Sequence, residues 1–191
     1  FQTGDKILSI NGEKIEKYDN EINMKLIMGK QVQIERNGAA QTIQMPVDLV
    51  DQLSKLEKGP LVNIRMPFAV TAIPEESLNK QLQPKDVIVS MNGQPAKYYD
   101  QVKAILNANK GKTLPAVVIR NEKEVPVQVI VNQEAKLGIQ MGSLGLESLE
   151  KLGYYKISKQ EYGFFESIPV GIERGKDQLL GYGKQLKMIF N

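Results

Sequence analysis

The stretch GDKILSING at residues 4–12 returns as KDVIVSMNG at residues 85–93. The copies lie 81 positions apart, and each runs from an aspartate through mostly apolar residues to an Asn-Gly pair. This pattern is typical of a β-strand that ends in a tight turn, because asparagine and glycine tolerate a positive φ. The chain therefore contains an internal repeat. The matched residues are Asp5 and Asp86, Ser9 and Ser90, Asn11 and Asn92, and Gly12 and Gly93.

The similarity continues downstream and predicts the same series of elements in each copy. Apolar residues at helical spacing predict a helix, and alternating stretches at 31–45 and 115–131 predict β-hairpins. A short strand, at 62–66 and at 137–141, closes each copy. The apolar helix positions are Ile22, Leu26 and Ile27 in the first copy, and Tyr99, Val102, Ile105 and Leu106 in the second. Further matches are Tyr18-Asp19 with Tyr99-Asp100 and Arg36-Asn37 with Arg120-Asn121.

The second copy has two additional elements in front of it. Residues 68–73 predict a strand and residues 74–82 predict a short helix, with a proline near its start. Their counterparts in the first copy would precede residue 1, so we expect the native polypeptide to extend upstream. The copies also differ at a turn, where Lys85 stands in the position of Gly4. That turn must avoid a positive φ or accept strain.

The composition excludes several classes of function. The chain has 191 residues, 41% of them hydrophobic and 25% charged, with a net charge of +3. No dense basic stripe interleaved with aromatic residues appears, so we expect no nucleic-acid partner. The absence of cysteine excludes a disulfide scaffold, and the absence of histidine excludes histidine zinc sites and Ser-His-Asp triads. Catalysis within this chain would need carboxylates or a Ser-Lys dyad.

Candidate catalytic groups all have simpler interpretations. Glu75 and Glu76 stand at the start of the predicted helix 74–82, where the helix dipole favours negative charge. Ser54-Lys55 and Ser158-Lys159 are sequence neighbours, which is not the geometry of a dyad. We expect no catalytic residue and no metal ligand in this chain.

The unit of strand, Asn-Gly turn, helix, hairpin and closing Leu-Gly-Ile strand resembles a PDZ domain. The closing strand stands last, as in the circularly permuted PDZ domains of bacterial proteases. Two such units in tandem, followed by the tail YGFFESIPVGIERGKDQLLGYGKQLKMIFN at 162–191, resemble the extracytoplasmic region of the bacterial site-2 protease family. There a Tyr-Gly-x-Phe motif leads into an amphipathic stretch and a membrane helix. In this chain the motif is Tyr162, Gly163, Phe164 and Phe165.

The resemblance implies an α+β, mainly β fold with two PDZ-like, partly open β-barrels in tandem and a partly helical C-terminal tail. The first domain would span residues 1–67, without its N-terminal strand and helix, and the second would span 68–142. The tail, 143–191, would lead toward a membrane segment. Its mixture of apolar and basic residues suits either a membrane surface or a protein groove.

The resemblance also implies a peptide-binding groove in each domain. A peptide would add as a strand beside the closing strand, with its carboxylate in a nest of backbone N–H groups. The first groove would use Val62, Asn63, Ile64, Ile22 and Leu26, and the second Leu137, Gly138, Ile139, Val102, Ile105 and Leu106. Asn63 replaces the usual glycine, and asparagine is the residue that next best tolerates a left-handed conformation. From periodicity alone, Ile105, Leu106 and Ile139 fit a plain core role equally well.

The function implied by the resemblance is substrate gating or peptide binding for an intramembrane zinc metalloprotease. Such proteases release membrane-bound anti-sigma factors by regulated intramembrane proteolysis, and these domains lie on the periplasmic face of the bacterial inner membrane. The family's zinc ligands, a His-Glu-x-x-His helix and a distant aspartate, lie in its membrane segments. Zinc is therefore implied for the parent protein and no cofactor for this segment.

The partners implied are C-terminal or extended peptide segments of trimmed membrane-protein substrates, and the parent's own membrane domain. Gating by size exclusion and gating by direct peptide recognition both remain open. Two other interpretations also remain open, namely a stand-alone PDZ scaffold and the PDZ region of a soluble extracytoplasmic serine protease. The flanking sequence distinguishes them, since only a site-2 protease has apolar membrane spans on both sides.

Overall fold

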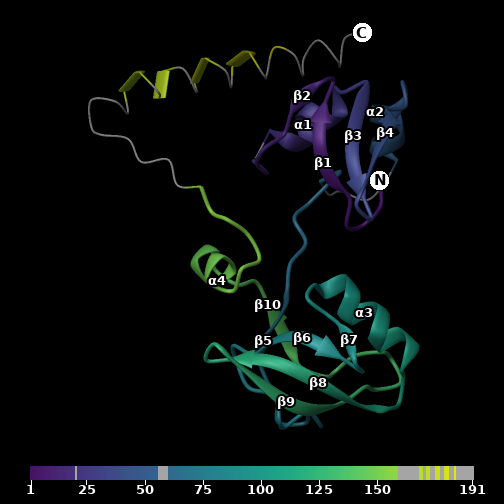
Figure 1. Cartoon of the computed structure of the whole chain (residues 1–191), viewed down its shortest axis with the longest axis vertical. Coiled ribbons are helices and arrows are strands. Elements are labelled where there is room, and N and C mark those ends of the chain that lie inside the picture. The colour runs from purple at the N-terminus through teal and green to yellow at the C-terminus, as the bar shows by residue number, and fades with distance from the viewer. Residues whose placement is uncertain are drawn as a thin grey trace. The chain divides into compact units, whose positions relative to one another are not determined.

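The chain forms two compact units, Phe1–Gly145 and Leu146–Asn191 (Figure 1). The computed structural model describes residues 1–19, 21–55 and 60–158, together with 168–169, 171–172, 175–176, 179–180 and 183. Strands make up most of the regular structure of the first unit, and short helices join them. The predicted α+β, mainly β fold class is therefore confirmed. The domain boundaries at 67/68 and 142/143 stay predictions.

The N-terminal half of the first unit is a four-stranded antiparallel sheet with the order β2-β1-β3-β4. Its strands are β1 (Lys6–Ile10), β2 (Glu13–Lys14), β3 (Gln31–Arg36) and β4 (Ala39–Gln44), and its helices are α1 (Ile22–Ile27) and α2 (Leu49–Ser54). The predicted hairpin is the β3–β4 pair, which turns at Asn37-Gly38. Helix α2 was not predicted, because Leu49 is its one buried side chain and a single apolar position gives no periodic signal.

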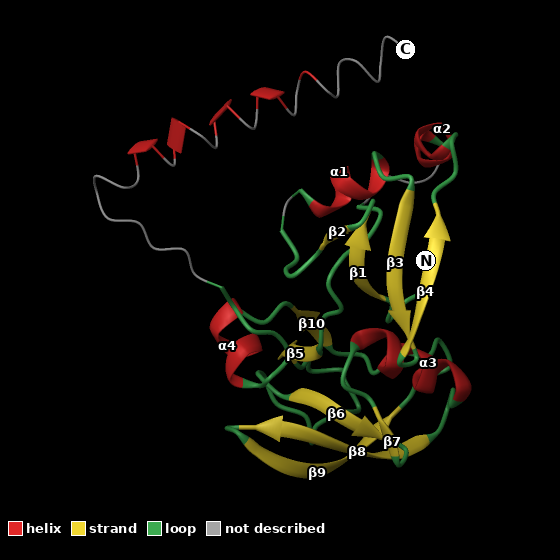
Figure 2. Cartoon of the chain, turned by 45° about the horizontal axis from the view of Figure 1, so that its top comes forward, coloured by secondary structure: helices red, strands yellow, loops and turns green. Residues whose placement is uncertain are grey.

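The second half has a larger sheet with the order β10-β5-β6-β8-β9, and β7 pairs with β6 (Figure 2). Its strands are β5 (Phe68–Ala72), β6 (Val87–Met91), β7 (Gln94–Pro95), β8 (Thr113–Arg120), β9 (Lys123–Ile130) and β10 (Gln140–Gly142). Helix α3 (Tyr99–Ala108) contacts β6. The strand predicted at 68–73 and the hairpin predicted at 115–131 are thus present, as β5 and as β8 with β9.

A carboxylate–guanidinium pair with a buried carboxylate and a half-buried arginine occurs in both halves at matched positions. In the first half, Nε and Nη2 of Arg36 donate to the two carboxylate oxygens of Asp5, each over 2.7 Å. In the second half, the same two nitrogens of Arg120 donate to Asp86 over 2.7 and 2.6 Å. Each carboxylate also accepts a hydrogen bond from the backbone N–H three residues upstream. The sequence repeat is therefore a repeat of hydrogen bonds as well.

The Asp5 pair predicts a loss of stability in acid. The pKa of Asp5 is lowered from 3.8 to about 2, chiefly by the hydrogen bonds from Arg36; burial opposes this shift, and the hydrogen bond from the Gln2 N–H adds to it. A depressed folded-state pKa stabilises the fold fully above pH 3.8, and this contribution disappears as the pH falls through 2. It amounts to about 2 kcal/mol. Urea unfolding between pH 5 and pH 2 should show this slope, and Asp5→Asn should remove it; an equal slope in the variant would contradict the assignment.

The turns before β1 and β6 also match, although their residues differ. Gly4 has φ +99° and Lys85 has φ +76°. A lysine in this region is strained, because its Cβ approaches the backbone closely. The backbone is held there because the Lys85 N–H donates to the carbonyl of Val70 and the Asp86 N–H donates to that of Gln83. Of the two outcomes foreseen for this turn, the strained one occurs.

Replacing this lysine with glycine should therefore stabilise the protein. We expect Lys85→Gly to raise the free energy of unfolding by about 0.5–1 kcal/mol. The backbone strain that is relieved exceeds the cost of the greater conformational freedom of glycine in the unfolded chain. Lys110→Gly is the matched control, because Lys110 is an exposed lysine without a positive φ. It should lose stability. Equal losses in both variants, measured by urea unfolding, would show that Lys85 is not strained.

The predicted helix at 74–82 is wrong, since this segment consists of turns. The N–H of Ser77 donates to the carbonyl of Pro74, and the N–H of Leu82 donates to that of Asn79. Within the segment, Ser77 Oγ accepts the N–H of Asn79 over 3.2 Å. Serine and asparagine side chains compete in this way with helical hydrogen bonds. Glu75 and Glu76 are exposed turn residues and not the first turn of a helix.

The predicted closing strands also need correction. In the second half, β10 begins at Gln140, so the Leu-Gly-Ile stretch is a loop that precedes the strand. In the first half, residues 62–66 form no strand. The reason is visible in the second half, where β10 pairs with β5. No strand among residues 1–19, 21–55 and 60–67 corresponds to β5, so the segment 62–66 has no strand to pair with.

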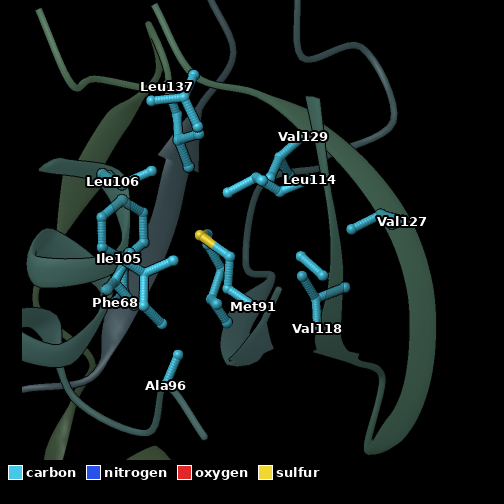
Figure 3. Packing of buried hydrophobic residues seen from close by; sticks show 14 of the residues in the cluster. Phe68, Met91, Ala96, Ile105, Leu106, Leu114, Val118, Val127, Val129 and Leu137 are labelled. Carbon is cyan, nitrogen blue, oxygen red and sulfur yellow. The ribbon is translucent and has the colours of Figure 1, made fainter. Parts of the chain in front are cut away.

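Each half has its own hydrophobic core. Ile10, Ile22, Leu26, Val32 and Ile34 form the smaller core. In the second half, Met91 lies among the side chains of the sheet, the helix and the loop that contains Leu137 (Figure 3). The large second core joins α3 to the sheet, so it fixes one side of the site described below.

The second unit contains α4 (Leu146–Lys151), with Leu149 buried. Nine described positions between 168 and 183 have helical backbone, and the side chains of Ile168, Ile172, Leu179 and Leu180 are exposed. The motif Tyr162, Gly163, Phe164 and Phe165 lies outside the described residues. Over the part of the chain that the structure describes, no helix is both long enough and apolar enough to cross a membrane.

Candidate functional site

The strand β10 lies at one end of the larger sheet and offers an unpaired edge. One edge pairs with β5, with Gln140 opposite Ala72 and Gly142 opposite Ala69. Among the described residues no strand pairs with its other edge. An exposed strand edge of this kind is where an extended peptide adds to a sheet.

The predicted loop Leu137-Gly138-Ile139 leads into this edge strand. Leu137 is buried in the core, Gly138 is exposed, and Ile139 is half-buried and packs on the same core. Gly138 has φ +62°. A Cβ at Gly138 would approach only the Ser77 hydroxyl, at 4.0 Å, so the backbone conformation and not crowding requires glycine here.

The loop also presents backbone donors. The N–H groups of Leu137, Gly138 and Ile139 have no acceptor among the described residues. Successive backbone N–H groups around a left-handed residue form a concave site that binds anions. The arrangement therefore suits a carboxylate at the start of the β10 edge.

Asn79 holds this loop in place, and sequence analysis missed it. Its Nδ2 donates to the carbonyls of Leu137, over 2.6 Å, and Ile130, over 2.9 Å. Its Oδ1 accepts the N–H of Ile130 over 2.7 Å, and the residue is only 2% exposed. The amide thus ties the loop to the end of β9. The sequence analysis predicted a helix over 74–82 and assigned no role to Asn79, because its partners Ile130 and Leu137 are more than fifty residues away.

The predicted helix residues of the second groove are Val102, Ile105 and Leu106, and all three are buried in the core with Leu137 (Figure 3). The structure therefore does bring the predicted residues of the second groove together. They belong to the same buried cluster as Leu137, which is the core role that periodicity left open for Ile105 and Leu106.

The predicted first groove is not assembled in the same way. Ile22 and Leu26 are buried in the first core and Val62 packs on it, but Asn63 is exposed and has no positive φ. Val62 donates its N–H to Asn23 Oδ1 over 2.8 Å and accepts from the Tyr18 hydroxyl over 3.3 Å. The segment is therefore bound to the helix side of the first half.

A pocket of about 560 Å³ lies at the far end of β10. Met141, Gly142 and Ser143 line one side, and Tyr99 and Asp100, at the start of α3, line another. The connecting segment 63–69 and Thr3 form the rest of the lining, so Asn63 and Ile64 of the predicted first groove belong to this pocket instead.

Arg65 fixes the connecting segment against α3. Its Nε and Nη2 donate to the two oxygens of Asp100, over 3.0 and 2.6 Å. Its guanidinium also lies 4.0 Å from the centre of the Tyr98 ring, which is a cation–π contact. The N–H of Tyr99 donates to the carbonyl of Met66 over 2.8 Å.

The structure assembles none of the weighed catalytic arrangements over the described residues. The Ser54 hydroxyl donates to the carbonyl of Asp51 over 2.8 Å, and Lys159 lies outside the described residues. No three histidine, cysteine, aspartate or glutamate side chains of the described part cluster as metal ligands would. What the described residues offer at this site is backbone N–H groups and a strand edge that can form hydrogen bonds.

No protein-family model matches the chain. Among solved structures, the chain is similar to the PDZ domain of an SdrC-like protein from Listeria monocytogenes. The sequence identity is 14% and the TM-score 0.35, over 47% of this chain and 97% of that domain.

Proposed function

We propose that the second half of the first unit is a PDZ-type peptide-binding module. An extended peptide would add antiparallel to β10, with its terminal carboxylate on the N–H groups of Leu137, Gly138 and Ile139. The observation that carries this proposal is the set of three N–H groups at the start of the β10 edge, which have no partner among the residues that the structure describes. The first half does not form the equivalent loop, so binding is assigned to the second half alone.

Titration with peptides that end in an apolar residue tests this function. We expect a Kd near the micromolar range for the free acid, and at least about tenfold weaker binding for the same peptide with a C-terminal amide. Gly138→Ala should also weaken binding by about tenfold, because alanine resists φ +62°. Gly38→Ala is the matched control, because Gly38 also has a positive φ, of +78°, but lies in the β3–β4 turn of the first half; it should leave the Kd unchanged. Equal binding of acid and amide would contradict the proposal.

We further propose that the parent protein is a bacterial site-2 protease, for which this chain is the extracytoplasmic gate on the periplasmic face of the inner membrane. Support comes from the repeated Asp–Arg pairs, the closing strand at the end of the second sheet, and exposed apolar side chains in the helical backbone of the tail. The chain has no histidine, so it does not fit the protease's zinc site. Zinc and the catalytic residues would belong to other segments of the parent.

Mass-spectrometric sequencing of the native polypeptide tests this context. A His-Glu-x-x-His motif in an upstream apolar helix, with a membrane span after residue 191, would support the protease. A catalytic serine domain would instead favour the PDZ region of a soluble serine protease. If the polypeptide has neither feature, the stand-alone PDZ scaffold is favoured. The peptide titration separates recognition from size exclusion, because a gate that acts by size alone requires no peptide affinity.

A further inference from the structure

The pocket beside the start of α3 continues the β10 edge, away from the N–H groups of the loop. In an antiparallel pairing, each step toward the N-terminus of the peptide moves one residue forward along β10. With the carboxylate at residues 137–139, the second residue upstream of the peptide's last residue lies opposite Met141. The fourth upstream residue then lies opposite Ser143, which lines the pocket.

The pocket has an apolar character. Met66, Phe68, Tyr99 and Met141 line it, and Phe68 stacks on Tyr99 with 6.0 Å between ring centres. Its volume of about 560 Å³ lies in the range of sites that enclose ligand groups. It is therefore large enough for an aromatic or branched aliphatic side chain.

The charge at the pocket is balanced. Among the described residues that line the pocket, Asp100 is the one with an acidic side chain, and both of its carboxylate oxygens accept hydrogen bonds from Arg65. A basic peptide side chain would have to compete with Arg65 for the carboxylate of Asp100. An acidic peptide side chain would be repelled by the negative charge of Asp100. An uncharged apolar side chain has neither cost.

We propose that this pocket is a second recognition site for the same peptide, and that it takes a large apolar side chain at the fourth position upstream of the C-terminal residue. The site rests on the proposed function and narrows its substrate class. Arg65 acts as a specificity-determining residue, because it occupies the carboxylate that would otherwise attract a basic side chain.

Eight-residue peptides that differ only at this position test the proposal on the full chain, with a four-residue peptide as the reference. We expect phenylalanine or leucine to bind at least about fivefold more tightly than alanine, lysine or aspartate. Ser143→Trp should fill the pocket and remove this preference without changing the Kd of the four-residue peptide, which does not reach Ser143. Val47→Trp is the matched control, because Val47 is fully exposed in the other half.

Arg65→Met provides a second test, because it frees Asp100. In this variant, the eight-residue peptide with lysine at the tested position should bind at least as tightly as the peptide with alanine there. A mere loosening of the connecting segment 63–69 would not cause this change of preference. If the four-residue peptide binds but the Kd values of all eight-residue peptides agree within twofold, the pocket is not a recognition site and the proposed function stands. If no peptide binds, both are overturned.

Discussion

Asp86→Asn is expected to lower the free energy of unfolding by about 3 kcal/mol. Asp86 is 0% exposed, and its carboxylate accepts two hydrogen bonds from Arg120 and one from the N–H of Gln83. Removing its charge leaves the guanidinium of Arg120 without its counter-ion. The cost stays at the lower end of the range for buried pairs, because the Arg120 side chain is 20% exposed and also donates to the carbonyl of Gln81.

A double-mutant cycle measures this interaction by urea unfolding. Asp86→Asn combined with Arg120→Met should cost less than the sum of the two single variants, because the second change removes the uncompensated charge. Glu134→Gln serves as the control, since its ion pair with Lys136 is exposed to solvent and contributes little to stability. Additive losses in the cycle would show that the two side chains do not act as a pair.

The sequence predicted those parts of the fold that repeat a short local pattern. The hairpin with its turn at Asn37-Gly38, the helix that contains Val102 and Leu106, and the repeated strands all follow from periodicity and turn residues. The repeat also aligned Asp5 with Asp86 and the partner arginines with each other, although sequence reasoning did not pair aspartate with arginine. Pairing partners are some thirty residues apart, and periodicity carries no information about them.

Errors arose where a side chain bonds to distant backbone. The segment 74–82 has helical composition, yet Asn79 bonds to the backbone of Ile130 and Leu137, 51 and 58 residues away. The strand predicted at 62–66 failed for the same kind of reason, since a strand needs a neighbour and local sequence does not supply one. The pocket was missed because it is formed by Arg65, Asp100 and Met141, which come together only in the folded chain.

Asn79→Ala is expected to lower the free energy of unfolding by about 3 kcal/mol and to weaken peptide binding at least about tenfold. The change leaves three backbone groups without their partner, which are the buried carbonyl of Leu137 and the half-buried N–H and carbonyl of Ile130. Asn79→Asp should be as severe, because a carboxylate cannot donate to two carbonyls. Both variants release the loop whose N–H groups bind the peptide carboxylate in the proposed function.

The positioning role of Asn79 is separated from its contribution to stability by measuring the Kd at a temperature where the variant is still folded. The loss should be much larger for the free-acid peptide than for its amide, since only the acid uses the loop. Asn107→Ala, an exposed asparagine on α3, should leave both stability and Kd nearly unchanged. Suppose that folded Asn79→Ala binds the free-acid peptide as tightly as the unmutated chain does. The loop would then hold its N–H groups in place without the Asn79 amide, and Asn79 would contribute to stability only.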